Sequence, residues 1–447
     1  MATIIGPGTV LTQDDQWRVI RDGSVLVDGD RVMEVGGFGE MLMSHPEAKL
    51  YDAGGRTIMP GLINAHAHFY GLFARGISLK DPAPTTFRQV LERLWWRLDR
   101  ALDHEGVRLS ALLGGVAALR AGCTTVVDHH ASPNCIDGSL DQVAEAMERL
   151  GLRACLCYEV SDRDGPEKAA AGIAENVRFA RSLGGPAPDA TGQAPDAPAP
   201  RSRLAAKFGL HAAFTLADET LAATRRAEAD LGLGFHIHCA EGPEDRGAPA
   251  RLHQAGILGA KTILAHCVHV DDADLALLAE SGTTVSHQPH SNMGNAVGWS
   301  RLQEMAGKGV STALGTDGYT FDMLETMRTA AVLHAHETGR PGAGVAEFAK
   351  VMLRGNAALA NAIFGRKVGT LVPGAAADII LLDYFPPTPI DAGNLPWHLQ
   401  FGMAAPQVHT VWVDGRLVME GRCITSVDEI ALARRATDVA AATWERF

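Results

Sequence analysis

The pattern of apolar and polar positions changes twice along this chain. Residues 1–58 form short runs in which apolar and polar residues alternate between Gly and Asp turns, a pattern that predicts β-strands. From about 60 to 370, short apolar runs alternate with longer segments of helical periodicity. After 370 the β pattern returns, and a helical segment over 427–446 closes the chain. Repeated strand-helix alternation is typical of an α/β protein with a parallel (β/α)8 TIM barrel.

Polar residues follow directly after several of the apolar runs. In a barrel of this kind the reactive groups lie at the carboxyl ends of the strands, so these residues are the candidates for chemistry. The expected barrel strands include 124–128, 154–159, 205–211, 234–238, 262–266, 284–287 and 311–315, and the expected helices include 218–231, 273–281 and 322–337.

The two terminal β regions are each too small to fold alone. We therefore expect residues 1–58 and 371–425 to form one composite β-sandwich domain, beside a metal-dependent barrel over 59–370 and a C-terminal helix over 426–447. A Pro-, Ala- and Gly-rich stretch at 184–200 lacks periodicity and is expected to be a surface loop without chemistry.

Composition narrows the class of protein. A net charge of -12 with no Lys/Arg stripe argues against a nucleic-acid partner and leaves a small molecule as the expected one. The 7 cysteines include no CxxC pair, which predicts reduced thiols in a cytoplasmic protein. The sequence has no apolar run of about 18 residues and no signal peptide, so no membrane association is expected. We expect a homodimer, with the helical stretch 87–102 as a possible contact surface.

Residues 59–68 carry the first candidate chemistry, because they end in a His-x-His pair. Side chains two positions apart on a strand point to the same face, so His66 and His68 form half of a metal site. Alone, the pair is equally compatible with chance in a chain of 18 histidines.

Other strand ends supply the rest of a catalytic metal centre with an open position for water. His238 ends one strand, and Asp317 ends another between two glycines, so these residues complete the ligand set. Glu241 follows His238 by three positions, which places its carboxylate over the water as a general acid and base rather than on the metal. His236 lies one layer deeper and is expected to be hydrogen-bonded behind the ligands.

The number of metals stays open from the residues alone. His266 is either a ligand of a second metal or a hydrogen-bond donor to the tetrahedral intermediate. A second metal usually needs a bridging group, and the candidate is Lys207 with a carboxylated amine. Lys207 lies about two residue layers below the strand end at His211, so a buried ion pair or a solvent-facing amine is the favoured interpretation, and one metal is expected.

Together these segments resemble the amidohydrolase superfamily, within the branch of cytosine, guanine and adenosine-type deaminases and triazine hydrolases. The resemblance extends over nearly the whole chain, and details at 68–76, 128–133 and 317–320 are most similar to the SsnA-like aminohydrolases. One departure is His-Gln-Pro-His at 287–290, where relatives have Asn-Pro before Ser-Asn. The segments that carry the resemblance are 60–68, 238–241, 265–269, 291–293, 315–318 and 374–380.

The resemblance implies one Zn2+ per chain, held by His66, His68, His238 and Asp317, although this donor set also accepts Fe2+ or Mn2+. It implies Glu241 as the proton shuttle and His266, with Asp317, as the groups that polarise the intermediate. The residues expected around the substrate are Tyr70, Arg75, His129, His130, His211, Asn292 and Tyr319.

Three functions follow from these residues. The first is a zinc-dependent aminohydrolase that releases ammonia from an amino-substituted purine, pyrimidine or related ring, through a metal-bound hydroxide and Glu241. The second keeps the metal but acts as a cyclic amidase or dehalogenase-type hydrolase, with a functional Lys207 as its marker. The third is a non-catalytic metal-binding barrel in an assembly, which is disfavoured because a structural zinc has four protein ligands and needs no poised base.

Overall fold

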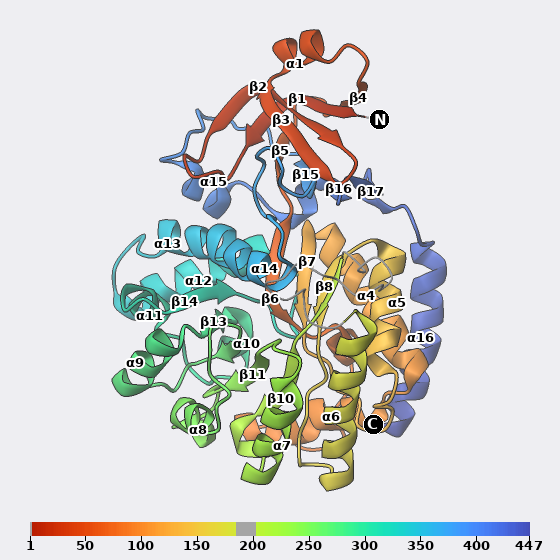
Figure 1. Ribbon diagram of the computed structural model, residues 1–447, viewed down its shortest axis with the longest axis vertical. Helices are drawn as coiled ribbons and strands as arrows, with labels where there is room; N and C mark the ends of the chain where they lie inside the picture. Colours follow the sequence, from red (N-terminus) through yellow and green to blue (C-terminus); the bar gives the residue numbers. More distant parts are fainter. Residues whose placement is uncertain (1, 185–202) are drawn as a thin grey trace.

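The computed structural model describes residues 2–184 and 203–447 (Figure 1). The loop expected at 184–200 therefore lies, except for Gly184, outside the described residues. Figure 1 shows a barrel in the lower part of the molecule and a sheet, built from the red and blue ends of the chain, above it. No helix in the described part of the chain is long and apolar enough to cross a membrane.

A ring of parallel strands forms the barrel. Strands β6 to β9 pair in one run and β10 to β14 in another. The two runs are joined by bridges between Val160 and Leu210 and between Ala67 and Asp317, which close the ring. The predicted (β/α)8 barrel is thus confirmed, because β9 and β10 are separated by Lys207 alone and together form one of its eight strands. Its strands are β6 (Leu62–Ala67), β7 (Cys123–Asp128), β8 (Arg153–Leu156), β9 (Leu204–Ala206), β10 (Phe208–Ala212), β11 (Phe235–Cys239), β12 (Ile263–His266), β13 (Thr284–His287) and β14 (Ser311–Leu314).

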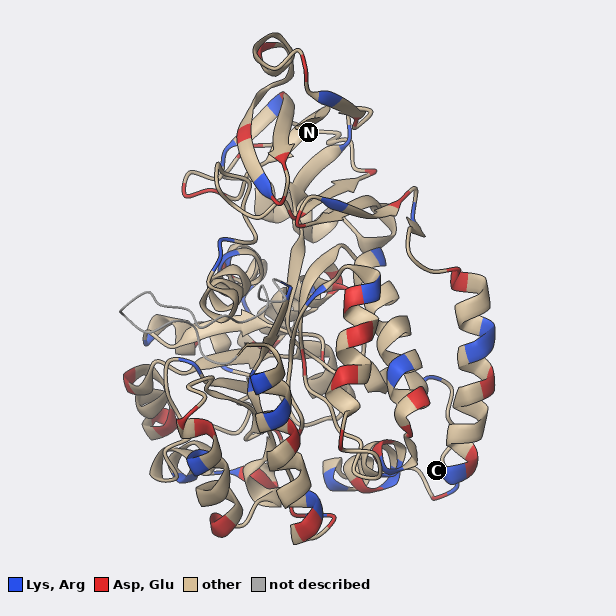
Figure 2. Ribbon diagram, turned by 45° about the vertical axis from the view of Figure 1, so that its right-hand side comes forward, with Lys and Arg blue, Asp and Glu red and all other residues tan. Residues whose placement is uncertain are grey.

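Amphipathic helices cover the outside of the barrel. In α5 (Ser139–Leu150), Leu140, Val143 and Met147 recur at helical spacing and are buried against the strands. Helix α9 begins at a capping box in which the Asp271 carboxylate accepts the backbone N–H groups of Ala273 and Asp274. The other helices of this layer include α4 (His104–Arg120), α6 (Pro166–Ser182), α7 (Asp218–Ala229), α9 (Asp272–Ser281), α11 (Leu302–Gly307) and α12 (Met323–Thr338). Figure 2, a ribbon with basic residues blue and acidic residues red, shows both colours interspersed along the helices around the barrel.

Both ends of the chain contribute to one separate sheet, which confirms the expected terminal appendage. Strand β5 (Thr57–Pro60) lies between β1 (Thr3–Leu11) and β15 (Ile379–Leu382), so the two terminal segments pair directly. The closing helix α16 (Glu429–Arg446) packs against α4 beside the barrel. The other strands of the sheet are β2 (Val19–Asp28), β3 (Arg31–Gly37), β4 (Lys49–Asp52), β16 (Val408–Val413), β17 (Arg416–Glu420) and β18 (Cys423–Ile424).

Arg153, the first residue of β8, joins the barrel to this sheet. Its side chain is fully buried and donates hydrogen bonds to the carboxylates of Asp378 and Asp414, which flank strands of the sheet. Asp378 also accepts the backbone N–H of Asp414 at 2.8 Å. A buried guanidinium shared by two carboxylates fixes how the strands of the two layers meet.

The segment after β6 supplies the aromatic side chains that line the space above the strand ends. It contains a short 3-10 turn, η1 (Phe69–Ala74), followed by α2 (Phe87–Val90), the π-helical turn η2 (Leu91–Trp95) and α3 (Trp96–Ala101). The helical stretch expected at 87–102 is therefore present but interrupted by a π turn, a feature that is frequent at functional sites. Trp95 contacts the backbone region of Gly71 and Gly318, at the rim of the barrel.

Candidate active site

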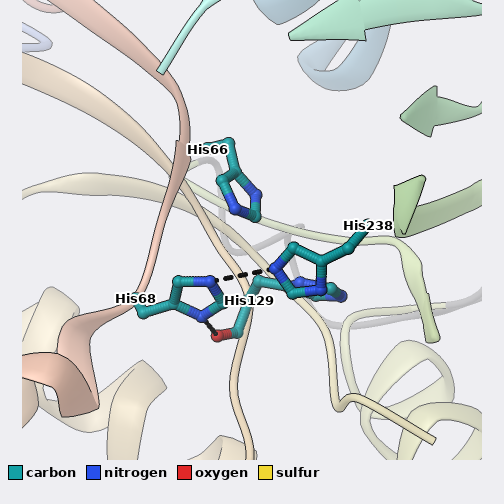
Figure 3. A group of neighbouring side chains, drawn as sticks. All are labelled: His66, His68, His129 and His238. Carbon is teal, nitrogen blue, oxygen red and sulfur yellow. Dashed lines mark hydrogen bonds between the residues drawn. The ribbon is translucent and has the colours of Figure 1, made fainter. Parts of the chain in front are cut away.

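Four histidine side chains converge at the carboxyl end of the barrel (Figure 3). His66 lies on β6 and His68 just beyond it, His129 follows β7, and His238 lies on β11. One ring nitrogen from each lies within 4.8 Å of the others, and a second such group contains His66, His266 and Asp317. The structure therefore brings together the residues expected at the metal site, with His129 beside them.

The hydrogen bonds behind two of these histidines decide which ring nitrogen faces the centre. His68 Nδ1 lies 2.6 Å from the carbonyl oxygen of His129, and His238 Nδ1 lies 2.8 Å from that of His211. A carbonyl oxygen only accepts, so both Nδ1 atoms donate and each neutral ring has its lone pair on Nε2. These two Nε2 atoms are 3.2 Å apart, a distance at which a proton on one ring or a metal cation between the rings satisfies both nitrogens. A divalent metal is the cation that such a group of imidazole nitrogens usually binds.

His66 and His266 contribute two further buried nitrogens. His66 Nδ1 lies 2.8 Å from His236 Nε2, as expected for a residue one layer deeper, and His266 Nδ1 donates to Asn292 Oδ1 at 2.8 Å. The Nε2 atoms of His66 and His266 are buried and have no hydrogen-bond partner among the described residues. Imidazole rings whose other nitrogen is hydrogen-bonded to the protein, together with one carboxylate, suit zinc and similar divalent metals.

Carboxylates make the electrostatic potential at this point negative. Asp317 Oδ1 lies 3.3 Å from His68 Nε2, and Glu159 Oε1 lies 3.3 Å from His68 Nδ1. Burial lowers the pKa of His68, but Glu159, Asp317 and Asp128 outweigh this effect and raise the pKa to about 9. The same carboxylates favour a metal cation.

Several strand ends in the site have left-handed backbone conformations. The φ angles are +49° at Ala240, +76° at His266 and +58° at Asp317, a region that non-glycine residues rarely adopt. Such conformations persist where the surrounding structure determines them, and they cluster at functional sites. Gly315 allows the close approach that this arrangement needs, because a Cβ there would lie 2.7 Å from the backbone nitrogen of His66.

Glu241 lies beside the metal-ligand cluster without belonging to it. Its Oε2 atom is 3.4 Å from His266 Nε2, and Asn295 donates to its Oε1 atom at 3.2 Å. Burial and the nearby charge of Asp317 raise the pKa of Glu241 well above its ordinary value. A carboxyl group in this environment is suited to carry a proton.

One pocket contains these groups and some of the residues expected around the substrate. Tyr70 and His211 line it, whereas Arg75 is exposed outside it. His130 is buried and bonds Ser132, and Tyr319 is 41% exposed beside Asn295. His129 and Asn292 lie behind the ligands rather than in the lining. The lining is His68, Tyr70, Phe87, Leu91, Trp95, Trp96, Asp99, Glu159, Arg163, His211, Ala212, Phe214, His238, Glu241, Asp245, Asn295 and Asp317.

Glu159, Asp99 and Arg163 are pocket residues that sequence reasoning missed. Glu159 ends the apolar run 154–159, so the rule that polar strand ends carry chemistry would have identified it. Asp99 lies on α3 and Arg163 in the loop after β8, and neither has a local signal. Only the fold brings them together as an ion pair.

Lys207 lies away from the histidine cluster. Its amine donates to the carbonyl oxygens of Leu233, at 2.6 Å, and Lys261. Burial lowers the pKa of Lys207 to about 8. Both carbonyls lie before the first residues of β11 and β12, at the opposite end of the barrel from the site. A bridging role between two metals is therefore not supported.

Comparison with known proteins gives consistent matches over the whole chain. The Amidohydrolase family matches residues 57–418. The 5-methylthioadenosine/S-adenosylhomocysteine deaminase of Pelotomaculum thermopropionicum is 32% identical over 444 residues, 96% of each chain. The 5'-deoxyadenosine deaminase of Methanosarcina mazei is 30% identical over 450 residues, 98% of this chain and 97% of the relative.

Solved structures show the same fold. A zinc-bound adenosine deaminase from Xanthomonas campestris superposes with a TM-score of 0.84 at 23% identity, covering 99% of this chain and 98% of its own. A zinc complex of atrazine chlorohydrolase from Arthrobacter aurescens superposes with a TM-score of 0.77 at 22% identity, covering 98% and 100%. At these identities the likeness is one of fold.

Proposed function

This chain belongs to the amidohydrolase family, and from that premise we propose that it is a metal-dependent aminohydrolase that releases ammonia from an amino-substituted nitrogen heterocycle. It is a hydrolase of C–N bonds, in keeping with relatives that are deaminases. The observation that carries the proposal is the cluster of buried histidine nitrogens, in which the Nε2 atoms of His68 and His238 are 3.2 Å apart, beside a separate buried carboxyl group on Glu241.

The proposed metal is zinc. His66, His68, His238 and Asp317 would hold it. Nitrogens of the three histidines lie together, Asp317 Oδ1 lies 3.3 Å from His68 Nε2, and the other ring nitrogens of the histidines are hydrogen-bonded behind them. When bound, a divalent metal lowers the pKa of a coordinated water and so supplies a nucleophile near neutral pH.

The remaining chemistry belongs to side chains of the pocket. Glu241 accepts one proton from the attacking water and passes it to a ring nitrogen of the substrate. It then takes the second proton from the new hydroxyl group and delivers it to the departing amine, which leaves as ammonia. His266 faces the same space through Nε2, and its bond to Asn292 fixes the orientation of the ring. Asn295 holds the Glu241 carboxyl group in place through its Oε1 atom.

Replacement of Glu241, the proposed proton carrier, tests the proposal. Zinc-loaded wild-type protein is expected to release ammonia from at least one ring in a panel of oxidised purines, pyrimidines and triazines. Glu241→Gln should lower kcat by about 10²–10⁴-fold, the usual contribution of a general acid and base, with zinc content unchanged because Glu241 is not a ligand. Glu244→Gln, at an exposed position in the same loop, is the control and should keep full activity. Full ammonia release by Glu241→Gln would exclude the mechanism.

We also propose a cytoplasmic homodimer. All seven cysteines lie within the described residues and are free, which suits a reducing compartment. Trp397 and Phe401 stack at 5.9 Å on the surface, with 45% and 79% of their area exposed. An exposed aromatic pair of this kind suits a subunit contact.

A further inference from the structure

An ion pair lies in the pocket apart from the metal ligands and Glu241. Arg163 donates to Asp99, and their side chains are 7% and 1% exposed. Both line the same pocket as Glu241 and Asp317, and Trp96 packs 5.4 Å from the Arg163 guanidinium. Burial raises the pKa of Asp99 to about 6 against the effect of Arg163, so its carboxylate is still ionised and accepts hydrogen bonds at neutral pH.

Four polar atoms of this group are buried without a hydrogen-bond partner among the described residues. They are Asp99 Oδ1, Arg163 Nη1, Arg163 Nε and the indole Nε1 of Trp96. Arg163 Nε has a charged neighbour, since Asp164 Oδ2 lies 3.4 Å away, so the other three atoms are the more isolated ones. Buried polar groups are normally paired, since an unpaired one lowers stability. Unpaired atoms on three side chains that line one pocket therefore indicate contacts completed by a ligand.

A ligand that pairs with these atoms must present a hydrogen-bond acceptor next to a hydrogen-bond donor. A carbonyl oxygen has two lone pairs and can accept from both Arg163 Nη1 and Trp96 Nε1, while an adjacent N–H donates to Asp99 Oδ1. We propose that Asp99, Arg163 and Trp96 recognise the lactam edge, –NH–C(=O)–, of the heterocycle, so that the substrate is an amino-substituted ring that also carries an oxo group. This inference rests on the proposed aminohydrolase function.

Apolar side chains complete the lining of this pocket. Phe87, Leu91 and Trp95 lie around the same space as the ion pair. Apolar and aromatic groups suit the faces of a planar heterocycle, which leaves its polar edge to meet Asp99 and Arg163.

The hydroxyl groups of a sugar could also supply an adjacent donor and acceptor. A matched set of substrates distinguishes recognition of a lactam edge from recognition of a sugar. The set pairs isoguanine with adenine, guanine with 2-aminopurine and cytosine with 4-aminopyrimidine, because each pair differs by the oxo group and its ring N–H. Adenosine and 5'-deoxyadenosine complete it. Hydrogen bonds to charged groups typically change affinity by about 10–100-fold. Zinc-loaded wild-type enzyme should favour the oxo member of its reactive pair by at least that factor in kcat/KM, mainly through KM.

Two substitutions test the individual contacts. Trp96→Phe removes only the indole N–H, and Asp99→Asn replaces an acceptor by an amide. Both should reduce the preference for the oxo member about 10-fold or more, with zinc content and melting temperature close to wild type. Trp95→Phe is the matched control, because Trp95 lines the pocket without a buried unpaired nitrogen; it should affect both members of a pair alike.

The outcomes distinguish this inference from the proposed function. Faster ammonia release from adenosine or 5'-deoxyadenosine than from every bare ring, or equal rates on the two members of each pair, overturns the lactam assignment and leaves an aminohydrolase. No ammonia from any ring overturns the proposed function. Calorimetric binding of the same rings to zinc-loaded Glu241→Gln then still tests the recognition: tighter binding of the oxo members supports it, and equal binding or none overturns it.

Discussion

Each histidine proposed as a metal ligand is oriented by the atom bonded behind it. His68 and His238 donate to backbone carbonyls, whereas His66 contacts another side chain, His236, through Nδ1. Cys157 Sγ in turn lies 3.8 Å from His236 Nδ1. Partners behind a metal ligand set its tautomer and ring orientation. Replacing the His236 side chain should therefore disturb His66 alone, because side-chain replacement leaves the backbone carbonyls that hold His68 and His238 in place.

His236→Phe is expected to weaken zinc binding by about 10–100-fold, the usual effect of losing such a partner. A planar aromatic ring is kept, while His66 Nδ1 loses the nitrogen atom 2.8 Å away. Competition with a chromophoric chelator measures the affinity. The control is His253→Phe, at an exposed position on α8 (Ala248–Gln254). Equal zinc affinities for both variants would contradict the assigned role.

The sequence predicts some residues of the site better than others. His66, His68, His238 and Asp317 lie at strand ends, where the alternation of apolar and polar positions and the short spacing of the histidines make them recognisable in the sequence. Asp99 and Arg163 cannot be identified in this way. Their ion pair joins α3 to the loop after β8, and only tertiary packing brings these distant segments together.

At the scale of elements, the close contact between β6 and β14 closes the barrel and shapes the site. The backbone N–H groups of Thr316 and Asp317 both donate to the carbonyl oxygen of His66, at 2.9 and 3.0 Å. Gly315 lies against the same residue. The expected strands 284–287 and 311–315 nearly match β13 and β14, because strong apolar runs define them. The π turn at Leu91–Trp95 was not expected, since one extra residue per turn leaves the apolar pattern almost unchanged.

Gly315→Ala should therefore destabilise the protein and loosen the metal site together. The new methyl group would lie 2.7 Å from both the backbone nitrogen and oxygen of His66, so the two strands must separate. Overpacking of this kind costs about 1–3 kcal/mol. Gly307→Ala on α11 is the matched control, because nothing lies within 4 Å of a Cβ there. Calorimetric melting and zinc content should fall only for Gly315→Ala; an unchanged melting temperature would contradict the close packing.

At the scale of the whole molecule, the barrel and the terminal sheet depend on a shared buried charge. We propose boundaries after residues 58, 370 and 425, with the sheet and barrel unfolding as one unit because Arg153 belongs to both. The strand-helix alternation predicts the two architectures, but it cannot predict this connection, which pairs β8 with residues more than two hundred positions later.

Arg153→Met tests this connection. It leaves Asp378 buried without its cation and Asp414 with Arg366 alone, at 3.1 Å. Breaking a buried pair in this way costs about 3–5 kcal/mol. Calorimetry should show a lower melting temperature for barrel and sheet together, in one transition. Arg149→Met, at an exposed position on α5, controls for loss of a positive charge. Separate melting of the two parts in wild-type protein would contradict the shared unit.

Metal binding should stabilise the whole molecule, because the proposed ligands come from β6, β11 and the end of β14 and would so connect opposite sides of the barrel. Binding to the folded state alone adds about 1.4 kcal/mol per tenfold rise in free zinc above Kd. The melting temperature of chelator-treated protein should therefore rise steadily with zinc. Glu241→Gln should show the same rise, since its side chain only faces His266, whereas His238→Ala should not. A melting temperature independent of zinc in wild-type protein would show that these donors do not hold a metal.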